Sequence, residues 1–441
     1  MNIALSEIMN GSWKRRAIAV CEERGIPSLV DGLKPSQRFL LKRGYKMAKS
    51  SYDKVAAIAS TVAVEGYEHG ETSAANALVL MTADYCNNLP LFQGDGNFGN
   101  RLIPDASAPR YIFARLAPYI DLLFKDTEYA PEHPDEDVLV PLYYLPIIPL
   151  VLVNGIKGIA TGYATDIPPH DPVSLIDWLV ERTKTEKPKT QIRPKYYYFT
   201  GEIEKEPTCY RLSGTFECVS PIRIRVTELP PGQDSLSYNN HLKKLQEKGT
   251  IVSYEDASNG NRFEFLITLK KGTRWTDDEV RTRLKLVSSH TWNLTTVDEH
   301  GRLKVWDKET GIGDIMEAFY RFRLPFVERR IQDRLSELET QCAYLSAYVR
   351  FCRDVVDGNF SFRITDEEFR KGLQETYGVP ERFIEKVMDT PVRSFTEASI
   401  SKASKKLDET RKEQEYYQKT TPEKEYRKDL QELRKNIQDF S

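Results

Sequence analysis

The sequence predicts a multidomain α+β protein on three observations. The chain has 441 residues, which is too long for one hydrophobic core, since domains commonly contain roughly 150 residues. Helix-like periodicity in the N-terminal part gives way to alternating, strand-like sequence in the middle. Apolar residues at heptad spacing follow in the C-terminal part. Hydrophobic residues at 40% and charged residues at 29% are typical of a folded globular chain.

The N-terminal part predicts a helical domain of helix-turn-helix type. Between residues 34 and 84, the helix-like stretches SQRFLLKRGYKMAK and SAANALVLMTADYC are separated by short polar breaks. Residues 87–137 are rich in Gly, Pro and Asn and lack sustained apolar periodicity. Tyr111, in SAPRYIFARL, is therefore expected on a loop or a short element, where a tyrosine is better placed for chemistry than for packing.

The most apolar stretch, VLVPLYYLPIIPLVLV at 138–153, predicts buried strands and turns. It is shorter than the roughly 20 residues that span a bilayer, and Pro141, Pro146 and Pro149 interrupt it. The Gly- and Pro-rich stretch NGIKGIATGYATDIPPHDP then predicts a system of tight turns before the helix VSLIDWLVERTK. We expect a domain boundary near residue 165.

A β-rich middle domain and a helical C-terminal part follow the Lys- and Pro-rich connector at 183–195. The stretches YRLSGTFECV and IRIRVTELP alternate as strands do. A long helix from residue 311 carries a seam with alternating spacings of four and three residues: Ile331, Leu335, Leu338, Cys342, Leu345, Val349 and Cys352. A second helical stretch opens with Ile400, Ala403 and Leu407 and breaks at TTPE, where Thr421 and Pro422 predict an N-cap and a first helical position.

These two helical stretches can pair antiparallel, with residues 356–399 as a small globular tip between them. Two interpretations are open at this point. The pair forms a stalk that ends in a dimer contact, or it is a helical hairpin that packs on the body of its own chain.

Composition limits the class of protein. The N-terminal segment MNIALSEIMNGSWKRR has no apolar stretch of the signal-peptide kind, so we expect an intracellular, cytoplasmic protein. Six cysteines without CxxC spacing indicate neither a zinc site nor a disulfide framework. The net charge is −2, yet residues 11–50 hold ten Lys or Arg against three acids. This excess favours a DNA-facing surface, unless the acid-rich segments 65–71 and 128–137 balance it in the folded chain.

The stretch GDGNFG at 94–99 matches the GxGxxG pattern of dinucleotide-binding loops, but its context does not. That fingerprint needs a buried strand before it and a helix after it. Here NNLPLFQ precedes it, and the Pro-containing NRLIPDASAPR follows. The glycines therefore predict a tight turn.

Five motifs occur in order along the chain: RGIPSLVDGLKPSQRF (24–39), GYEHGETS (66–73), QGDGNFG (93–99), APRYIFARL (108–116) and LVNGIKGIATGYATDIPPH (152–170). Together they resemble the breakage-reunion subunit of type IIA DNA topoisomerases, a family that includes gyrase A, the topoisomerase IV C subunit and the C-terminal half of the eukaryotic enzyme. VTELP (226–230) and the C-terminal helices extend the resemblance over nearly the whole chain. Its length and C-terminus most resemble the medium subunit of T-even-type bacteriophage enzymes.

The resemblance implies a four-part architecture. It places a winged-helix, CAP-like DNA breakage-reunion domain at 1–165 and a β-rich tower at 166–310. A coiled-coil stalk would comprise 311–355 and 400–441, and a dimerisation tip, the C-gate, 356–399. The implied activity is a transient 5′-phosphotyrosyl double-strand break through which a second duplex passes, which gives relaxation and decatenation. The alternatives are a non-catalytic architectural DNA-binding dimer of the same fold and a tyrosine recombinase or nicking topoisomerase, which leaves the protein on the 3′ end.

The resemblance also implies site residues. Tyr111 would be the nucleophile. A phenol has a pKa of about 10, so it needs a base or a nearby cation to attack a phosphodiester. Arg110 and His69 would donate to the scissile phosphate. The chain has Tyr67 and Glu68 where bacterial members read HPHG, and Phe39 follows Arg38 where they often have paired arginines, so phosphate contacts are expected to be fewer.

The remaining predicted DNA-binding residues are Arg24, Lys34, Arg38 and Ile159. Ile159, in KGIATG, matches the family position that wedges between base steps; the alternative is a core isoleucine. His170, in IPPH, is expected to be structural.

Cofactors and partners follow from what the sequence lacks. We find no copy of the family's TOPRIM metal site, with its Glu and DxD, and no ATP-binding segment. We therefore expect no metal ligands in this chain and a separate ATPase/TOPRIM subunit that holds Mg²⁺ and uses ATP. The expected partners are double-stranded DNA and a second copy of the chain, joined through the DNA gate and the C-gate. If the protein is phage-encoded, its location is the host cytoplasm.

Overall fold

The computed structural model describes residues 11, 13–14, 25–160 and 162–438. The chain divides into two compact units: Met1–Arg323 with Arg427–Ser441, and Leu324–Tyr426. Arg24 and Cys21 lie outside the described residues. The four-part domain division stays a prediction. In the described part of the chain, no helix has both the length and the apolar character needed to cross a membrane.

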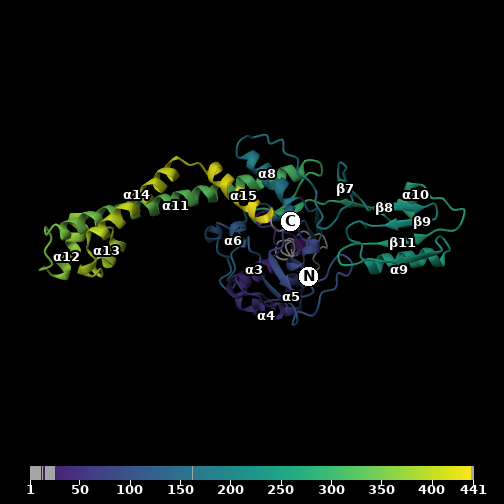
Figure 1. The fold of residues 1–441 in the computed structure, drawn as a ribbon, viewed down its shortest axis with the longest axis horizontal. Helices are drawn as coiled ribbons and strands as arrows, with labels where there is room; N and C mark the ends of the chain where they lie inside the picture. Colours follow the sequence, from purple (N-terminus) through teal and green to yellow (C-terminus); the bar gives the residue numbers. More distant parts are fainter. Residues whose placement is uncertain (1–10, 12, 15–24, 161, 439–441) are drawn as a thin grey trace, which may run out of the picture. The chain divides into compact units, whose positions relative to one another are not determined.

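From residue 25 to residue 116, the first unit contains three packed helices and a small sheet (Figure 1). The helices are α3 (Pro35–Met47), α4 (Val55–Ser60) and α5 (Glu71–Thr82), and a 3₁₀ turn, η3 (Thr61–Glu65), follows α4. The antiparallel sheet has the order β1 (Asp53–Lys54), β3 (Phe113–Leu116), β2 (Phe92–Asp95). Helix α3 begins with Pro35 because proline needs no N–H partner there. The two predicted helices are thus confirmed.

The prediction of strands at 138–153 is wrong, although the prediction of burial is confirmed from Tyr144 to Val153. The segment follows an irregular path and ends in a short helix, α7 (Leu150–Val153). Pro141, Pro146 and Pro149 lack the N–H groups that a strand ladder requires. The hairpin of β4 (Ile156–Ala160) and β5 (Tyr163–Ile167) comes next, so the boundary expected near 165 falls inside β5. Other short elements of this region are η4 (Asp84–Cys86), α6 (Ile120–Leu123) and η5 (Thr127–Tyr129).

The middle of the chain is β-rich, as predicted, and follows helix α8 (Pro172–Arg182). A four-stranded antiparallel sheet has the order β10 (Ser253–Asp256), β11 (Phe265–Thr268), β9 (Arg223–Val226), β8 (Phe216–Ser220). Helices α9 (Ser235–Glu247) and α10 (Asp277–Arg283) contribute apolar residues to its core, which includes Tyr238, Val280 and Phe265. A three-stranded sheet joins β12 (Val287–Thr291), β7 (Cys209–Ser213) and β6 (Glu202–Lys205), and β13 (Thr295–Val297) pairs with β14 (Leu303–Val305).

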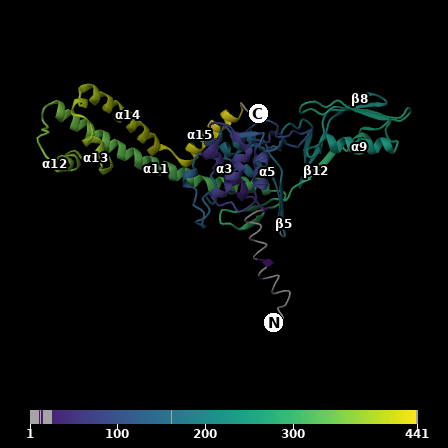
Figure 2. The same ribbon diagram turned by 90° about the horizontal axis from the view of Figure 1, so that it is seen from below.

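The second unit contains most of the long helix α11 (Gly311–Val356) and the returning helix α14 (Glu397–Lys419), which lie side by side in Figures 1 and 2. All seven predicted seam residues of α11 are buried or half-buried. Arg334 on α11 donates to Glu413 on α14 at 2.7 and 3.0 Å. Between the two helices lie α12 (Asp366–Gly372), the π-helical turn η6 (Leu373–Tyr377), α13 (Glu381–Met388) and η7 (Val392–Ser394), around an aromatic core that includes Phe351 and Phe395.

The last helix, α15 (Pro422–Gln438), begins after the predicted break, and the Thr421 hydroxyl accepts a hydrogen bond from the Lys424 N–H at 3.3 Å, as an N-cap does. From residue 427 onward the chain belongs to the first unit, whereas the resemblance placed this segment in the stalk. Ion pairs explain the difference, because Asp429 accepts from Lys125 at 2.5 Å and Arg434 pairs with Asp177 at 3.0 Å.

The buried side chain of His170 is expected to make the stability of the first unit depend on pH. It is fully buried, its Nε2 lies 3.1 Å from the Tyr210 hydroxyl, and its Nδ1 lies 3.3 Å from the Leu152 carbonyl. Burial lowers the pKa of His170 to about 4. Because the unfolded chain then binds the proton more tightly, stability is lost as the pH falls from about 6.5 towards 4, by up to about 3 kcal/mol.

The measurement is the free energy of unfolding at about pH 7 and about pH 4.5 for wild type and His170→Gln. The wild type is expected to lose more stability than the variant, which has no imidazole to protonate. Equal losses in the two proteins would contradict the assignment.

Candidate functional site

Tyr111 lies on the loop 96–112 that connects β2 to β3, two residues before β3 begins. Its side chain is 68% exposed, whereas the next residue, Ile112, is buried. The Tyr111 N–H donates to the Ala108 carbonyl at 2.9 Å, which closes a turn. The prediction that Tyr111 lies on a loop and not in a packed helix is therefore confirmed.

The C-terminal end of this loop is held by the start of helix α4. The Val55 N–H donates to the Ile112 carbonyl at 3.0 Å, and the Ala56 N–H donates to the Pro109 carbonyl at 3.1 Å. The first N–H groups of a helix have no partner within the helix, so the loop satisfies two of them. The backbone on both sides of Tyr111 is therefore fixed while its side chain stays in solvent.

The N-terminal end of the loop is held by a buried ion pair that the sequence did not predict. Both nitrogens of the Arg101 fork donate to Glu228, at 2.7 and 3.1 Å, and Arg101 also donates to the carbonyls of Tyr198 and Leu229. Arg101 and Glu228 are both buried. The neighbouring Leu102 lies in the core of the four-stranded sheet. The one sequence signal was Glu228 itself, a carboxylate inside the VTELP motif.

Arg110 and Tyr111 are brought together by the turn. The Arg110 guanidinium lies 5.7 Å from the centre of the Tyr111 ring. Arg110 is exposed and, within the described part of the chain, has no ion-pair partner. An exposed cation whose donors are not engaged can bind an anion next to the phenol.

His69 lies elsewhere on the same unit, just before α5, where Gly70 is the N-cap. Its ring contacts Tyr67 edge-on, with the ring centres 5.3 Å apart. It lines a cavity of about 750 Å³ with His133, Asp135 and Asp137, and neither Arg110 nor Tyr111 lines that cavity. Among the described contacts, none joins His69 to Tyr111. The structure therefore brings together two of the three predicted catalytic residues.

Several cations of the basic N-terminal window have acidic partners. Arg38 donates to the buried Asp31 at 2.7 and 3.1 Å. The buried Glu65 accepts from Arg43 at 2.9 Å and from Lys46 at 2.8 Å. Glu65 belongs to the acid-rich segment 65–71, so part of the local positive charge is balanced within the fold.

Lys34 donates to the Lys157 carbonyl at 2.9 Å, and burial lowers the pKa of Lys34. Within the described residues, Lys34 has no acidic partner that would neutralise its charge, as phosphate recognition requires.

Ile159 lies on β4, opposite Ala164 of β5, and its side chain is 82% exposed. The alternative of a core isoleucine is therefore excluded. The neighbouring Gly158 allows close approach to the chain at Gly25, because a Cβ at residue 158 would lie 2.0 Å from the Gly25 carbonyl oxygen. The hairpin is thus packed against the chain at Gly158, while the side chain of Ile159 is exposed to solvent.

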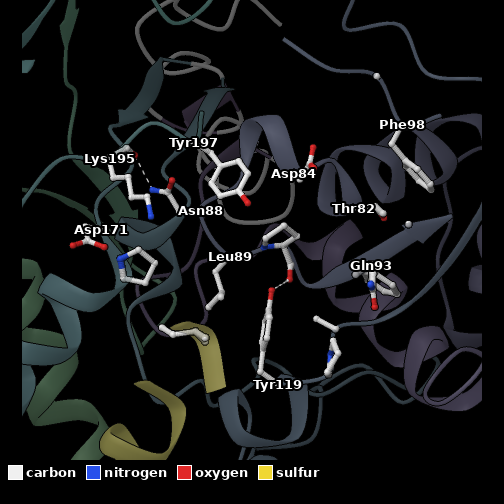
Figure 3. A pocket seen from close by; sticks show the side chains of 18 of the residues that line it. Thr82, Asp84, Asn88, Leu89, Gln93, Phe98, Tyr119, Asp171, Lys195 and Tyr197 are labelled. Atoms are coloured by element: carbon white, nitrogen blue, oxygen red, sulfur yellow. Dashed lines mark hydrogen bonds between the residues drawn. The ribbon is translucent and has the colours of Figure 1, made fainter. Parts of the chain in front are cut away.

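A cavity of about 400 Å³ is lined in part by residues of β2, and Figure 3 shows its lining. Asn88, which sequence reasoning did not single out, donates through Nδ2 to the carbonyls of Val153, His170 and Lys195 at 2.7 to 3.0 Å. Tyr119 donates to the Pro90 carbonyl in the same view. These bonds join segments that are distant in sequence, and the cavity does not include Tyr111. The Tyr111 side chain therefore lies outside this cavity.

No group of three or more His, Cys, Asp or Glu side chains is arranged to bind a metal ion, as far as the described residues extend. Cys86, Cys209, Cys218, Cys342 and Cys352 are free thiols. The GDGNFG stretch forms the end of β2 and a turn in which Gly96 and Gly99 have positive φ, and the next strand or helix along the chain is β3. It therefore lacks the helix that a dinucleotide-binding loop needs.

Comparison with known proteins places this geometry in a family. A family model for the A subunits of DNA gyrase and topoisomerase IV matches residues 24–434. The chain is 33% identical to the DNA topoisomerase medium subunit of Enterobacteria phage T4, over 98% of this chain and 99% of that protein. It is 29% identical to the mitochondrial DNA topoisomerase 2 of Dictyostelium discoideum, over 98% of this chain but 35% of that enzyme.

A solved structure has a similar fold. The DNA-binding, cleavage and re-ligation domain of Plasmodium falciparum topoisomerase II matches with a TM-score of 0.83 and 27% identity, over 97% of this chain and 63% of that one. The chain thus spans nearly all of the phage protein and about a third of the slime-mould enzyme. The resemblance seen in the five sequence motifs is confirmed.

The ion pair at the start of the Tyr111 loop gives a stability prediction. Glu228→Gln removes the negative charge and leaves Arg101 buried without a counter-ion, so the free energy of unfolding should fall by about 3–5 kcal/mol. The matched control is Glu217→Gln, which breaks the exposed pair with Arg225 (2.6 Å) and should cost less than about 1 kcal/mol. Denaturant unfolding measures both, and similar small losses would refute the role given to Arg101 and Glu228.

Proposed function

The chain belongs to the family formed by the A subunits of DNA gyrase and topoisomerase IV, and from that premise we propose that it is the DNA-cleaving subunit of an ATP-dependent type IIA DNA topoisomerase. One observation carries the proposal. Tyr111, 68% exposed, stands beside the exposed Arg110 on a loop that is held at both ends. A nucleophile needs this combination of access and fixed position.

In the proposed reaction, the Tyr111 oxygen attacks a backbone phosphorus of double-stranded DNA. A bond forms between this oxygen and phosphorus, the bond from phosphorus to the 3′ oxygen breaks, and the phenolic proton leaves to solvent or a base. The leaving 3′ oxygen takes up a proton from solvent or from that base and becomes a hydroxyl. The 5′ end stays attached as a phosphotyrosine, and the 3′ hydroxyl can later reverse the step. Because one phosphoester replaces another, cutting and rejoining are nearly balanced in energy.

Charge develops on the phosphoryl oxygens during attack, and Arg110 is placed to stabilise it. His69 would donate a second hydrogen bond to the phosphate once bound DNA reaches both His69 and Tyr111. Mg²⁺ would neutralise further charge. We assign the ion to the TOPRIM domain of a separate protein that also hydrolyses ATP, as the family resemblance implies.

We propose that two copies of the chain form a dimeric DNA gate, as the family resemblance implies. We assign α3, α4, α5 and the β1–β3–β2 sheet to a winged-helix domain, the middle sheets to a tower, and the α11–α14 pair to a stalk with its dimerisation tip at 356–399. Two copies would cut opposite strands, and a second duplex would pass between them, which gives relaxation and decatenation. Arg24, Lys34 and Arg38 are the proposed phosphate contacts and Ile159 the wedge. Arg38 would contact phosphate through Nη1, because its bonds to Asp31 use Nε and Nη2. The proposed location is the cytoplasm of a phage-infected host.

Removal of the phenolic hydroxyl tests the nucleophile. Wild type and Tyr111→Phe are mixed with the ATPase/TOPRIM partner, Mg²⁺ and plasmid, then denatured quickly. We expect the wild type to leave linear DNA with protein covalently attached and Tyr111→Phe to leave none, while DNA binding persists. Tyr163→Phe is the matched control, because Tyr163 is also exposed but lies on β5. Wild-type protein that binds DNA without ever attaching would support the architectural alternative.

Arg110 is tested by separating cleavage from binding. Arg110→Ala should lower the cleavage rate by about 10²–10³, the usual cost of losing one donor to transition-state charge. The affinity for DNA should change far less, because one phosphate contact among many is lost. Arg110→Lys keeps the charge but not the planar fork, so its cleavage rate should lie between those of wild type and Arg110→Ala. Equal losses in cleavage and affinity would mean that Arg110 only grips the backbone.

A further inference from the structure

A network of four polar side chains joins the hairpin that carries Ile159 to neighbouring segments of the fold. His290 Nε2 lies 2.7 Å from Asp166 Oδ1, and His290 Nδ1 lies 2.6 Å from the Tyr196 hydroxyl. Asp166 Oδ2 also accepts from Lys157 at 2.9 Å. All four residues line a cavity of about 900 Å³. Neither the proposed chemistry nor the Ile159 wedge uses these groups directly.

The four residues come from three separate parts of the fold. Lys157 and Asp166 face each other across the β4–β5 ladder, His290 belongs to β12 of the three-stranded sheet, and Tyr196 lies between α8 and β6. The network therefore ties the hairpin to a different sheet. A second tie lies next to it, since Asp166 and Asn293 exchange backbone hydrogen bonds of 2.9 and 3.0 Å.

One tautomer of a neutral imidazole satisfies both neighbours. Nε2–H donates to the Asp166 carboxylate, while Nδ1 accepts from the Tyr196 hydroxyl. Burial raises the pKa of Tyr196, so its hydroxyl keeps the proton that it donates. A hydrogen bond to a carboxylate is stronger than one between neutral groups, so the bond from His290 to Asp166 is the stronger of the two.

The hairpin needs such support. Strands β4 and β5 form a two-stranded sheet by themselves, and an isolated two-stranded hairpin is marginally stable. A side chain that wedges between base steps works against the cost of unstacking the bases. A hairpin that is not held in place would move when Ile159 presses against the bases, and the DNA would stay straight.

We propose that His290 is a positioning residue for DNA bending: by holding Asp166, it fixes the β4–β5 hairpin so that Ile159 stays in place against the bent duplex. The inference rests on the proposed role of Ile159. It predicts that loss of the hydrogen bond from His290 to Asp166 reduces DNA bending more than loss of the bond between His290 and Tyr196 does.

Two substitutions at residue 290 separate the two bonds. His290→Gln places an amide donor near the position of Nε2 and can keep the bond to Asp166. His290→Asn reaches only the position of Nδ1, so it keeps a partner for Tyr196 and loses Asp166. The control is His241→Gln, because His241 lies on α9 and its Nε2 bonds the Arg283 carbonyl at 2.9 Å.

The experiment measures energy transfer between dyes at the two ends of a duplex bound to the full chain with its ATPase/TOPRIM partner. Ile159→Ala is the reference for unbent DNA. We expect His290→Asn to lower the ratio of bent to straight DNA about tenfold, the effect of losing one charge-assisted hydrogen bond. His290→Gln and His241→Gln should stay near wild type. His290→Asn should also cut an intact duplex more slowly than wild type. A duplex with a single-strand gap at the bend should restore that cleavage, because it bends without resistance.

The outcomes are distinguishable. If Ile159→Ala leaves the bend unchanged, the proposed role of Ile159 fails. If Ile159→Ala straightens the DNA but His290→Asn does not, or if His290→Gln is as defective as His290→Asn, the inference about His290 is overturned. Should His290→Asn fail to fold, Asp166→Ala removes the same bond from the hairpin side, together with the Lys157 pair, and should straighten the DNA at least as much; a wild-type bend in that variant would also overturn it.

Discussion

The buried pair of Arg101 and Glu228 is the interaction on which the candidate site most depends. The two residues are 127 positions apart in sequence, and their two hydrogen bonds of 2.7 and 3.1 Å join the loop 96–112 to the β-rich middle of the chain. Ordering a loop costs roughly 1–2 kcal/mol of backbone entropy per residue. Contacts at both ends of the loop, with Glu228 at one and with α4 at the other, offset that cost while leaving Tyr111 in solvent.

Local patterns in the sequence predicted the parts of the fold that local patterns encode. The helices at 35–47 and 71–82, the strands around YRLSGTFECV and the buried seam of α11 follow from apolar periodicity. The strands expected at 138–153 did not form, since three prolines outweigh the apolar composition there. Tyr111 was placed correctly on a loop because its surroundings are rich in Gly and Pro.

The pairing of charges could not be predicted in the same way. Arg43 and Glu65 are 22 positions apart, and the sequence alone made the basic window around them look more available for DNA than it is in the fold. Glu228 and His290 draw their roles from partners more than 100 positions away. Ile159 left two interpretations open, because an isoleucine that follows a glycine suits a core and a wedge equally well until its exposure is known.

The same arrangement recurs at Tyr111 and at Ile159, where an exposed side chain stands in solvent on a backbone held from two sides. The central claim is that this arrangement makes Tyr111 the nucleophile. The most direct measurement is to trap the covalent complex with DNA, digest the protein and the DNA, and identify the modified peptide by mass spectrometry. The account predicts nucleotides joined through a 5′ phosphate to the peptide that contains Tyr111; attachment to any other of the 23 tyrosines, or through a 3′ phosphate, would contradict it.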